Sequence, residues 1–226
     1  MPFYRLPDEM IFPDPQLAEE DGLIAIGGDL SVDRLITAYS TGIFPWYSEG
    51  QPILWFCPDP RMVLYAGKFN YRKSLQRVVA SGKFEVRIDT NFRAVIEACA
   101  ATPRPDQDGT WITEDMKDAY ERLHHLGLAH SFETYQDNQL VGGLYGISLG
   151  KAFFGESMFH HQQDASKVAF QKLVEYTSAQ NFHFIDAQTP TPHLASLGAE
   201  EIPRVQFLKD LHHALAHPTH KGPWTH

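Results

Sequence analysis

The chain has 226 residues and a formal net charge of −9 at pH 7, with 43% hydrophobic and 21% charged residues. These proportions are ordinary for a soluble globular protein, and no apolar run approaches the roughly 20 residues that would span a bilayer. The N-terminus lacks a basic start followed by an apolar stretch, so it does not predict a secretory signal. Cys57 and Cys99 stand far apart without a CxxC partner, which indicates neither a disulfide framework nor a zinc site and fits a reducing cytoplasm.

The charge is unevenly distributed along the chain. Residues 1–60 carry two basic and ten acidic side chains, whereas residues 61–93 carry eight basic and two acidic ones. The acidic total argues against a general nucleic-acid binder. The basic segment could still hold a phosphate backbone locally while the rest of the chain repels it. The alternative is a solvated charged face without a ligand.

Residues 1–62 predict a small N-terminal domain of short strands and turns, because they are rich in proline and glycine. One helix is expected within it near residues 31–39, with Ser31 as its N-cap and Tyr39 on its apolar face. Residues 63–226 predict a second domain, because helix and strand patterns alternate there.

The second domain is expected to hold five helices and five strands. The apolar periodicity predicts helices over residues 71–80, 92–101, 114–126, 165–180 and 205–216. It predicts strands over residues 83–89, 130–136, 139–148, 151–159 and 183–188. Thr113 and Asp164 are the expected N-caps of the third and fourth helices. This order indicates an α/β (α+β) fold with a mixed sheet.

Residues 42–61, GIFPWYSEGQPILWFCPDPR, combine prolines with aromatic side chains around a short polar turn. The prolines exclude a regular core strand. Aromatic side chains held rigidly by proline suit the wall of a pocket that receives an apolar or planar group. A proline-kinked cap over a core would have the same composition.

Several blocks of the sequence resemble, in order, the leucyl/phenylalanyl-tRNA–protein transferase family. They are GGDLSVDRLITAYSTGIFPWYSEGQPILWFCPDPR, GTWIT, AHSFETY with LVGGLYG, FFGESMF, and FIDAQ with ASLGAEEIPR. Together they extend from about Gly27 to Arg204 and so cover most of the chain. The resemblance implies that the second domain has a GCN5-related acetyltransferase-like fold. It also implies a cytoplasmic enzyme that moves leucine or phenylalanine from charged tRNA to the α-amine of an N-terminal Arg or Lys, which marks the acceptor protein for degradation.

Three polar residues are candidates for the reaction centre. Asp186 and Gln188 stand two apart on an expected strand, so both side chains should point the same way, and the resemblance places this pair at the reaction centre. Whether Asp186 is a true base or only positions the amine stays open, and a substrate ribose hydroxyl is the alternative proton relay. Glu156 lies on an otherwise apolar strand and needs a partner. The acceptor's basic N-terminus or an internal arginine could be that partner.

Three groups of residues are candidates for substrate binding. The apolar pocket for the transferred amino acid is assigned by family position to Met158, Phe159 and Ile185. Stacking on the terminal adenosine is assigned to three aromatic residues, Trp46, Trp111 and Tyr120. Contacts to tRNA phosphates are assigned to four basic residues, Arg72, Lys73, Arg77 and Lys83. Any single aromatic residue could instead belong to the core.

No metal or nucleotide cofactor is expected, because an aminoacyl ester is already activated and the enzyme has only to orient two substrates and manage a proton. The histidine pairs at 124–125, 160–161 and 212–213 are adjacent in sequence, so they do not converge on one ion. No Q/R-x-x-G-x-G/A loop leads into the helix at 165, so coenzyme A is not expected either.

Two other functions are compatible with parts of the pattern. One is an acyl-CoA-dependent N-acyltransferase, which the absence of the phosphate loop disfavours. The other is a non-catalytic module that binds the tRNA end or the N-terminal signal. We expect a monomer, because nothing in the sequence suggests a coiled coil or a docking helix. Residues 217–226, HPTHKGPWTH, lie beyond the resemblance and are expected to be loosely ordered.

Overall fold

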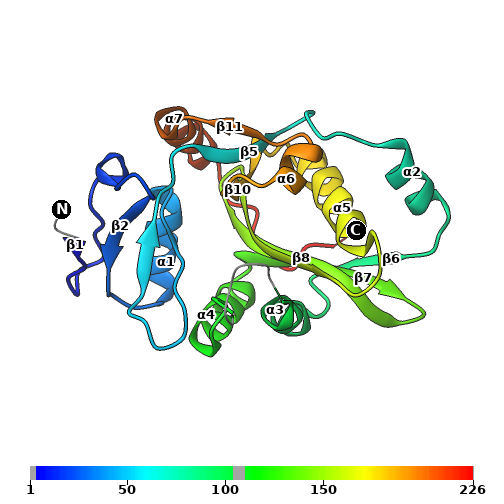
Figure 1. Ribbon diagram of the computed structural model, residues 1–226, viewed down its shortest axis with the longest axis horizontal. Helices are drawn as coiled ribbons and strands as arrows, with labels where there is room; N and C mark the ends of the chain where they lie inside the picture. The colour runs from blue at the N-terminus through cyan, green and yellow to red at the C-terminus, as the bar shows by residue number, and fades with distance from the viewer. Residues whose placement is uncertain (1–3, 104–109, 226) are drawn as a thin grey trace.

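The computed structural model describes residues 4–103 and 110–225, which form two β-sheets with helices around them (Figure 1). A four-stranded sheet in the order β1-β2-β4-β3 occupies the N-terminal part. A seven-stranded sheet in the order β11-β5-β10-β9-β8-β7-β6 carries the rest. The chain passes from the first sheet to the second between β4 and β5, and the domain boundary at residues 62 and 63 stays a prediction.

The N-terminal sheet consists of short strands. They are β1 (Tyr4–Arg5), β2 (Leu23–Ile26), β3 (Phe44–Pro45) and β4 (Leu54–Phe56), and a 3-10 turn covers Pro15–Leu17. Helix α1 (Val32–Ser40) packs against β3 and against two helices of the second domain, α4 and α7. Ser31 caps α1 as predicted, because its side chain accepts the backbone N–H of Arg34. Tyr39 lies on the buried face of this helix.

The second sheet is mixed. Its strands are β5 (Arg61–Tyr65), β6 (Glu85–Ile88), β7 (Ala129–Gln136), β8 (Gln139–Leu149), β9 (Ala152–His160), β10 (Phe184–Gln188) and β11 (Glu200–Ile202). Neighbouring strands are antiparallel, except that β9 and β10 run parallel. The predicted α/β fold with a mixed sheet is therefore confirmed.

Helices cover both faces of this sheet (Figure 1). On one face lie α3 (Phe92–Ala101) and α4 (Glu114–His125), and on the other lie α2 (Lys73–Ala80) and α5 (Ala165–Ala179). The remaining helices are α6 (Pro192–Ser196) and α7 (Arg204–Leu215). All five helices expected in this part are present, with ends that differ by at most two residues. The short strands β5 and β11 and the helix α6 were not predicted, because short elements carry too little periodicity.

The two predicted helix caps behave differently. Thr113 caps α4 as expected, because its hydroxyl accepts the backbone N–H of Met116. Asp164 occupies the N-cap position of α5, but its side chain makes no capping hydrogen bond. Its φ is +69°, and its carboxylate pairs with Lys167. The expected side-chain cap at Asp164 is therefore wrong.

Two clusters of buried apolar side chains form the core. One cluster fills the face under α3 and α4 and continues into the N-terminal sheet, so that Trp55, Ile96 and Phe207 belong to one group. The other lies under α2 and α5. The two sheets therefore share a core across the expected domain boundary.

Residues 217–225 place Trp224 against the second sheet, so the expectation that this tail is loosely ordered is wrong for them, and residue 226 lies outside the described residues. Trp224 is only 1% exposed. Its indole stacks on His130 with ring centroids 3.6 Å apart and on Tyr176 with centroids 4.6 Å apart. Its backbone N–H donates to Asp89, which also pairs with His130. Burying so large a ring outweighs the conformational entropy of ordering the segment.

We expect Trp224→Ala to lower the free energy of unfolding by about 3–5 kcal/mol, because it leaves a cavity in the second cluster. Trp46→Ala is the matched control, since that indole is 38% exposed, and its loss should cost less than about 1 kcal/mol. Chemical denaturation measures both variants. Equal losses would contradict the packing of the C-terminal segment.

Candidate active site

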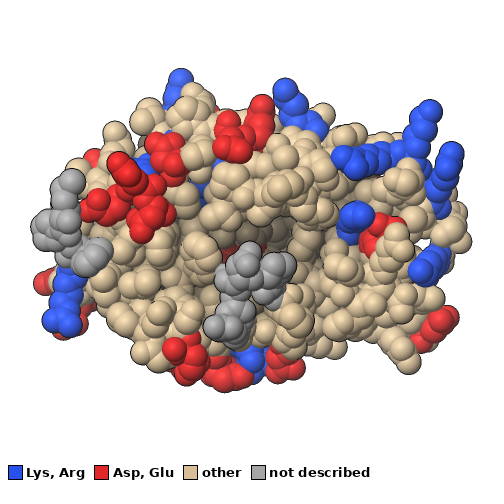
Figure 2. All heavy atoms as spheres, in the orientation of Figure 1, with Lys and Arg blue, Asp and Glu red and all other residues tan. Residues whose placement is uncertain are grey.

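A cavity of about 1040 Å³ opens where β9 and β10 separate. The two strands pair in parallel only as far as Phe154 opposite Asp186. Beyond that point β9 continues to His160 while β10 bends, and residues 155–161 and 185–189 line the space between them. Figure 2 shows a hollow near the centre of this face. The volume of the cavity lies at the upper limit of the range for small-molecule sites.

The cavity brings together most of the residues that the sequence selects for the reaction and for binding. Those that line it are Trp46, Trp111, Glu156, Met158, Phe159, Ile185, Asp186 and Gln188. They come from the loop after β3, the segment before α4, and strands β9 and β10. Tyr120 and the four selected basic residues do not line it.

One part of the cavity wall is apolar. Met158 and Ile185 line it together with Phe170 and Leu173, and these four side chains belong to the cluster under α5. Phe159 also lines the cavity, but it packs in the cluster on the other face of the sheet, because neighbouring strand residues point to opposite faces. A wall of this kind accommodates a branched or aromatic side chain.

Glu156 is buried among neutral hydrogen-bond donors. Its Oε1 accepts the hydroxyl of Tyr39 at 2.7 Å and the side-chain amide of Gln188 at 2.9 Å. Its Oε2 accepts the hydroxyl of Tyr120 at 3.0 Å. Burial raises the pKa of Glu156 to about 7, against the lowering effect of these hydrogen bonds, and the nearby charge of Asp186 adds to the rise. Among the described residues no arginine or lysine forms an ion pair with Glu156, so the alternative of an internal arginine partner is not found; its partners are Tyr39, Tyr120 and Gln188.

Tyr120 is part of this network and does not form part of the cavity wall. Its side chain has no exposed surface, its hydroxyl contacts Tyr39 as well as Glu156, and its ring packs edge-on against Tyr145. A fully buried ring offers no face to a base. The expectation that Tyr120 stacks on adenosine is therefore corrected.

Asp186 is held by Arg61 of β5 in a fully buried ion pair. The Nε and Nη2 atoms of Arg61 donate to the two carboxylate oxygens at 2.9 and 2.6 Å, and neither side chain has exposed surface. The guanidinium also lies over the rings of Phe44 and Phe207, at 4.9 and 4.4 Å from their centroids. This two-point geometry is the strong form of the Arg–carboxylate interaction.

The backbone of β10 turns at Gln188. Its N–H donates to Oδ1 of Asp186 at 2.9 Å, its φ is +62°, and the pairing register of the strand shifts between the two residues. The two side chains therefore serve different partners and do not project side by side from a regular strand. Asp186 binds Arg61, whereas Gln188 reaches Glu156.

Two residues of this site were not selected from the sequence. Arg61 belongs by sequence to the basic segment 61–93, although a carboxylate within the apolar strand FIDAQ signals that some cation must be buried with it. Tyr39 belongs by sequence to an apolar helix face, although a buried tyrosine hydroxyl needs a hydrogen-bond partner. Both signals exist, but only the tertiary fold identifies the partner.

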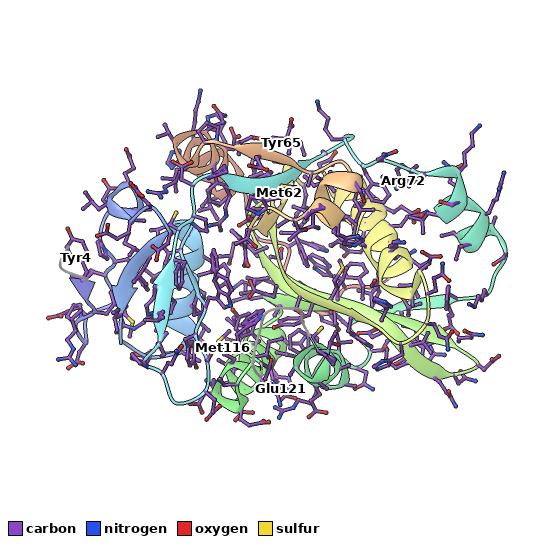
Figure 3. The ribbon with its side chains drawn as sticks, in the orientation of Figure 1. Tyr4, Met62, Tyr65, Arg72, Met116 and Glu121 are labelled. Carbon is purple, nitrogen blue, oxygen red and sulfur yellow. The ribbon has the colours of Figure 1, made fainter. Side chains whose placement is uncertain are left out.

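The four selected basic residues lie outside the cavity, on and beside α2. Arg72 precedes the helix (Figure 3), Lys73 and Arg77 belong to it, and Lys83 follows it. All four are exposed, and none takes part in an ion pair within the described residues. Figure 2 shows Lys and Arg side chains gathered over this end of the molecule.

Three of the other four basic residues of the segment 61–93 are neutralised by neighbours, whereas Lys68 is exposed and takes part in no ion pair among the described residues. Arg87 pairs with Glu85, and Arg93 pairs with four acidic side chains on α3 and α4, namely Glu97, Glu114, Asp118 and Glu121. Arg61 is buried against Asp186. The unpaired positive charge of the segment is therefore concentrated around α2.

Two absences hold for residues 4–103 and 110–225. In these ranges no three His, Cys, Asp or Glu side chains are arranged to hold a metal ion. None of the helices they form combines the length and the apolar character needed to cross a bilayer.

Comparisons with known proteins converge on one family. The family model described as leucyl/phenylalanyl-tRNA protein transferase matches residues 63–212, and the model of the N-terminal domain of that family matches residues 28–59. A curated relative named leucyl/phenylalanyl-tRNA–protein transferase from Desulfatibacillum aliphaticivorans is 54% identical, over 100% of this chain and 97% of the relative. One of the same name from Myxococcus xanthus is 53% identical, again over 100% and 97%. Among solved structures, a GCN5-related N-acetyltransferase-like protein from Streptococcus suis is 18% identical, with a TM-score of 0.39 over 71% of this chain and 59% of that chain.

We expect Arg61→Met to lower the free energy of unfolding by about 3–5 kcal/mol, because it leaves the charge of Asp186 buried without a partner. Arg61→Met combined with Asp186→Leu removes both charges and should recover much of that loss. Arg34→Met is the matched control, since Arg34 is also buried but its partner Asp29 is 49% exposed. Chemical denaturation compares the variants, and a double variant no more stable than Arg61→Met would contradict this account.

Proposed function

The chain belongs to the leucyl/phenylalanyl-tRNA protein transferase family, and we propose on this basis that it moves leucine or phenylalanine from charged tRNA to the N-terminal Arg or Lys of a protein. A new peptide bond forms at the α-amine of the acceptor and marks that protein for degradation. The enzyme acts as a monomer in the cytoplasm. The observation that carries this proposal is one cavity in which an apolar wall adjoins a buried polar network at the parting of β9 and β10. Identity of more than half over the full chain favours this function over an acyl-CoA-dependent acyltransferase or a binding module.

The apolar wall receives the transferred side chain. Met158 and Ile185, with Phe170 and Leu173, supply depth, and Phe159 closes the wall from the other core cluster. In a pocket of this kind, each methylene that a smaller substrate lacks weakens binding by about 1–3 kcal/mol. This favours leucine and phenylalanine over smaller or polar side chains.

The terminal adenosine of the tRNA stacks on Trp46 and Trp111. Both line the cavity, and the indole of Trp46 is partly exposed and fixed edge-on by Phe56 at a centroid distance of 5.6 Å. Base stacking on an aromatic side chain contributes about 1–3 kcal/mol per base. Tyr120 has no part in this contact.

The acceptor's amine reaches the ester carbonyl beside Glu156 and Gln188, which line the cavity and are hydrogen-bonded to each other. Glu156 receives the cationic N-terminus of the acceptor. Asp186 acts as a positioning residue, since its carboxylate is occupied by Arg61 and by the backbone N–H of Gln188.

The exposed basic residues around α2 hold the phosphates of the tRNA. The molecule is acidic overall, and its exposed positive surface around α2 consists of Arg72, Lys73, Arg77 and Lys83. They read shape and charge and carry no information about base sequence. Repulsion from the acidic remainder keeps the contact dependent on ionic strength.

The function is tested by transfer of labelled phenylalanine from charged tRNA to a protein that begins with Arg, beside the same protein beginning with Gly. We expect label on the Arg protein only, because the acidic site selects a basic N-terminus. If neither protein is labelled although charged tRNA is still bound, the chain is a non-catalytic binding module and not an enzyme. Label on both would show that the N-terminal residue is not recognised.

We expect Arg77→Glu to raise KM for charged tRNA about fivefold at low salt, with the effect fading as salt approaches about 0.2 M. The physical reason is the loss of one phosphate contact and the gain of one repulsion. Lys209→Glu on α7 makes the same change of charge at an exposed site outside the basic group. Equal effects from the two variants, in steady-state kinetics at two salt concentrations, would contradict the assigned surface.

A further inference from the structure

Glu156 closes a ring of three oxygen-bearing side chains inside the protein. The Tyr39 hydroxyl lies 2.7 Å from Oε1 of Glu156, and the Tyr120 hydroxyl lies 3.0 Å from Oε2. The two hydroxyl oxygens lie 2.5 Å from each other. The ring therefore has three oxygen–oxygen edges, each at hydrogen-bond distance.

Counting protons distinguishes the two charge states of this ring. Each tyrosine has one hydroxyl proton, so an ionised Glu156 leaves two protons for three edges. One edge is then a contact between two oxygens without a proton. A protonated Glu156 supplies the third proton, and every edge becomes a hydrogen bond: Glu156 donates to Tyr39, Tyr39 to Tyr120, and Tyr120 back to the carboxyl group. The ring is thus built to take up one proton.

The surroundings of the ring keep both states accessible. The titratable and charged groups facing Glu156 are Tyr39 from α1 and Tyr120 from α4, with Tyr145 of β8 behind Tyr120 and Asp186 of β10 held by Arg61 of β5. Burial of Glu156 raises its pKa to about 7, and burial beside Glu156 raises the pKa of each ring tyrosine well above its usual value. The proton that moves near neutral pH is therefore the one on the carboxyl group.

Only one member of the ring meets the cavity. Tyr39 and Tyr120 are fully buried and are not part of the lining, whereas Glu156 lines the cavity. Gln188 donates to Oε1 of Glu156 and so fixes the carboxyl group at the cavity wall. Resting on the function proposed above, we propose that Glu156 is the catalytic proton carrier of the transfer reaction. Tyr39 and Tyr120 are positioning residues, whose hydroxyl groups stabilise the protonated carboxyl group by hydrogen bonds.

The α-ammonium of the acceptor gives one proton to ionised Glu156, which closes the ring and leaves a neutral amine. The nitrogen lone pair forms a bond to the ester carbonyl carbon, and the carbonyl electrons move onto oxygen. As they return, the carbon–oxygen bond to the ribose breaks and its electron pair stays on the ribose oxygen, which takes the proton from Glu156. The second proton lost by the nitrogen passes to Glu156 and then to water.

The pH dependence of kcat/KM for an Arg-initiated peptide tests the carrier. Below about pH 7 the ring already holds its proton, and above about pH 8 the amine arrives without one. We therefore expect a maximum between these values. Glu156→Gln should lower the rate about a hundredfold at the maximum and should give a curve that only rises through the amine's own pKa. Curves of the same shape for the two proteins would overturn the proposal.

Removal of single hydroxyl groups tests the ring. Tyr39→Phe and Tyr120→Phe should each lower kcat about tenfold while leaving KM for charged tRNA unchanged. Tyr47→Phe is the matched control, since it deletes a buried hydroxyl that contacts Thr113 and not the ring. If Tyr39→Phe and Tyr120→Phe have the same kcat as Tyr47→Phe, the role assigned to the two ring tyrosines is overturned.

An infrared titration without substrates separates this inference from the proposed function. The difference spectrum of wild type against Glu156→Gln should show a protonated carboxyl band that disappears with a midpoint near pH 7. The band should be seen even if no phenylalanine is transferred to any acceptor, in which case the function fails and the ring stands. A carboxyl group that is already ionised at pH 5 would overturn the ring whatever the transfer assay shows.

Discussion

Three parts of the molecule meet at the guanidinium of Arg61. Phe44 of the N-terminal sheet and Phe207 of α7 lie over it, and Asp186 of β10 binds it at two points. Burying such a pair costs several kcal/mol per ion before the mutual attraction offsets it. The pair positions the site: Asp186 also accepts the backbone N–H of Gln188, and this turn of the backbone directs the side chain of Gln188 toward Glu156. The ion pair thereby links the packing of the two sheets to the atoms at the cavity wall.

Local pattern accounts for much of the fold. The periodicities of two and 3.6 residues predict the long strands and helices of the second sheet, and the cap at Thr113 is a sequence signal with a direct structural counterpart. The prolines and aromatic residues around Trp46 likewise predict a residue that lines the cavity. These features depend on near neighbours in the chain, so one sequence is sufficient to infer them.

Features that depend on distant partners could not be predicted. Nothing local distinguishes the buried Arg61 from the exposed Arg72, since their side chains differ only in what the fold brings against them. Tyr120 is an aromatic residue of the kind that stacks on bases, yet Tyr39 from another helix and Glu156 from a strand enclose it. The even spacing of Asp186 and Gln188 predicts a common direction, which a hydrogen bond between them overrides.

The place of Trp224 in the core has a consequence for synthesis of the chain. A ribosome releases the strands of the second sheet in order, and His130 and Tyr176, against which the indole stacks, emerge well before residue 224 does. Until then the slot between them is empty, although α2 and α5 are already available to cover the rest of that sheet face. Nascent chains bury core surface progressively, and what they leave exposed is what chaperones bind. The indole of Trp224 is therefore synthesised after the sheet and the helices that it packs against, and this part of the core is completed last.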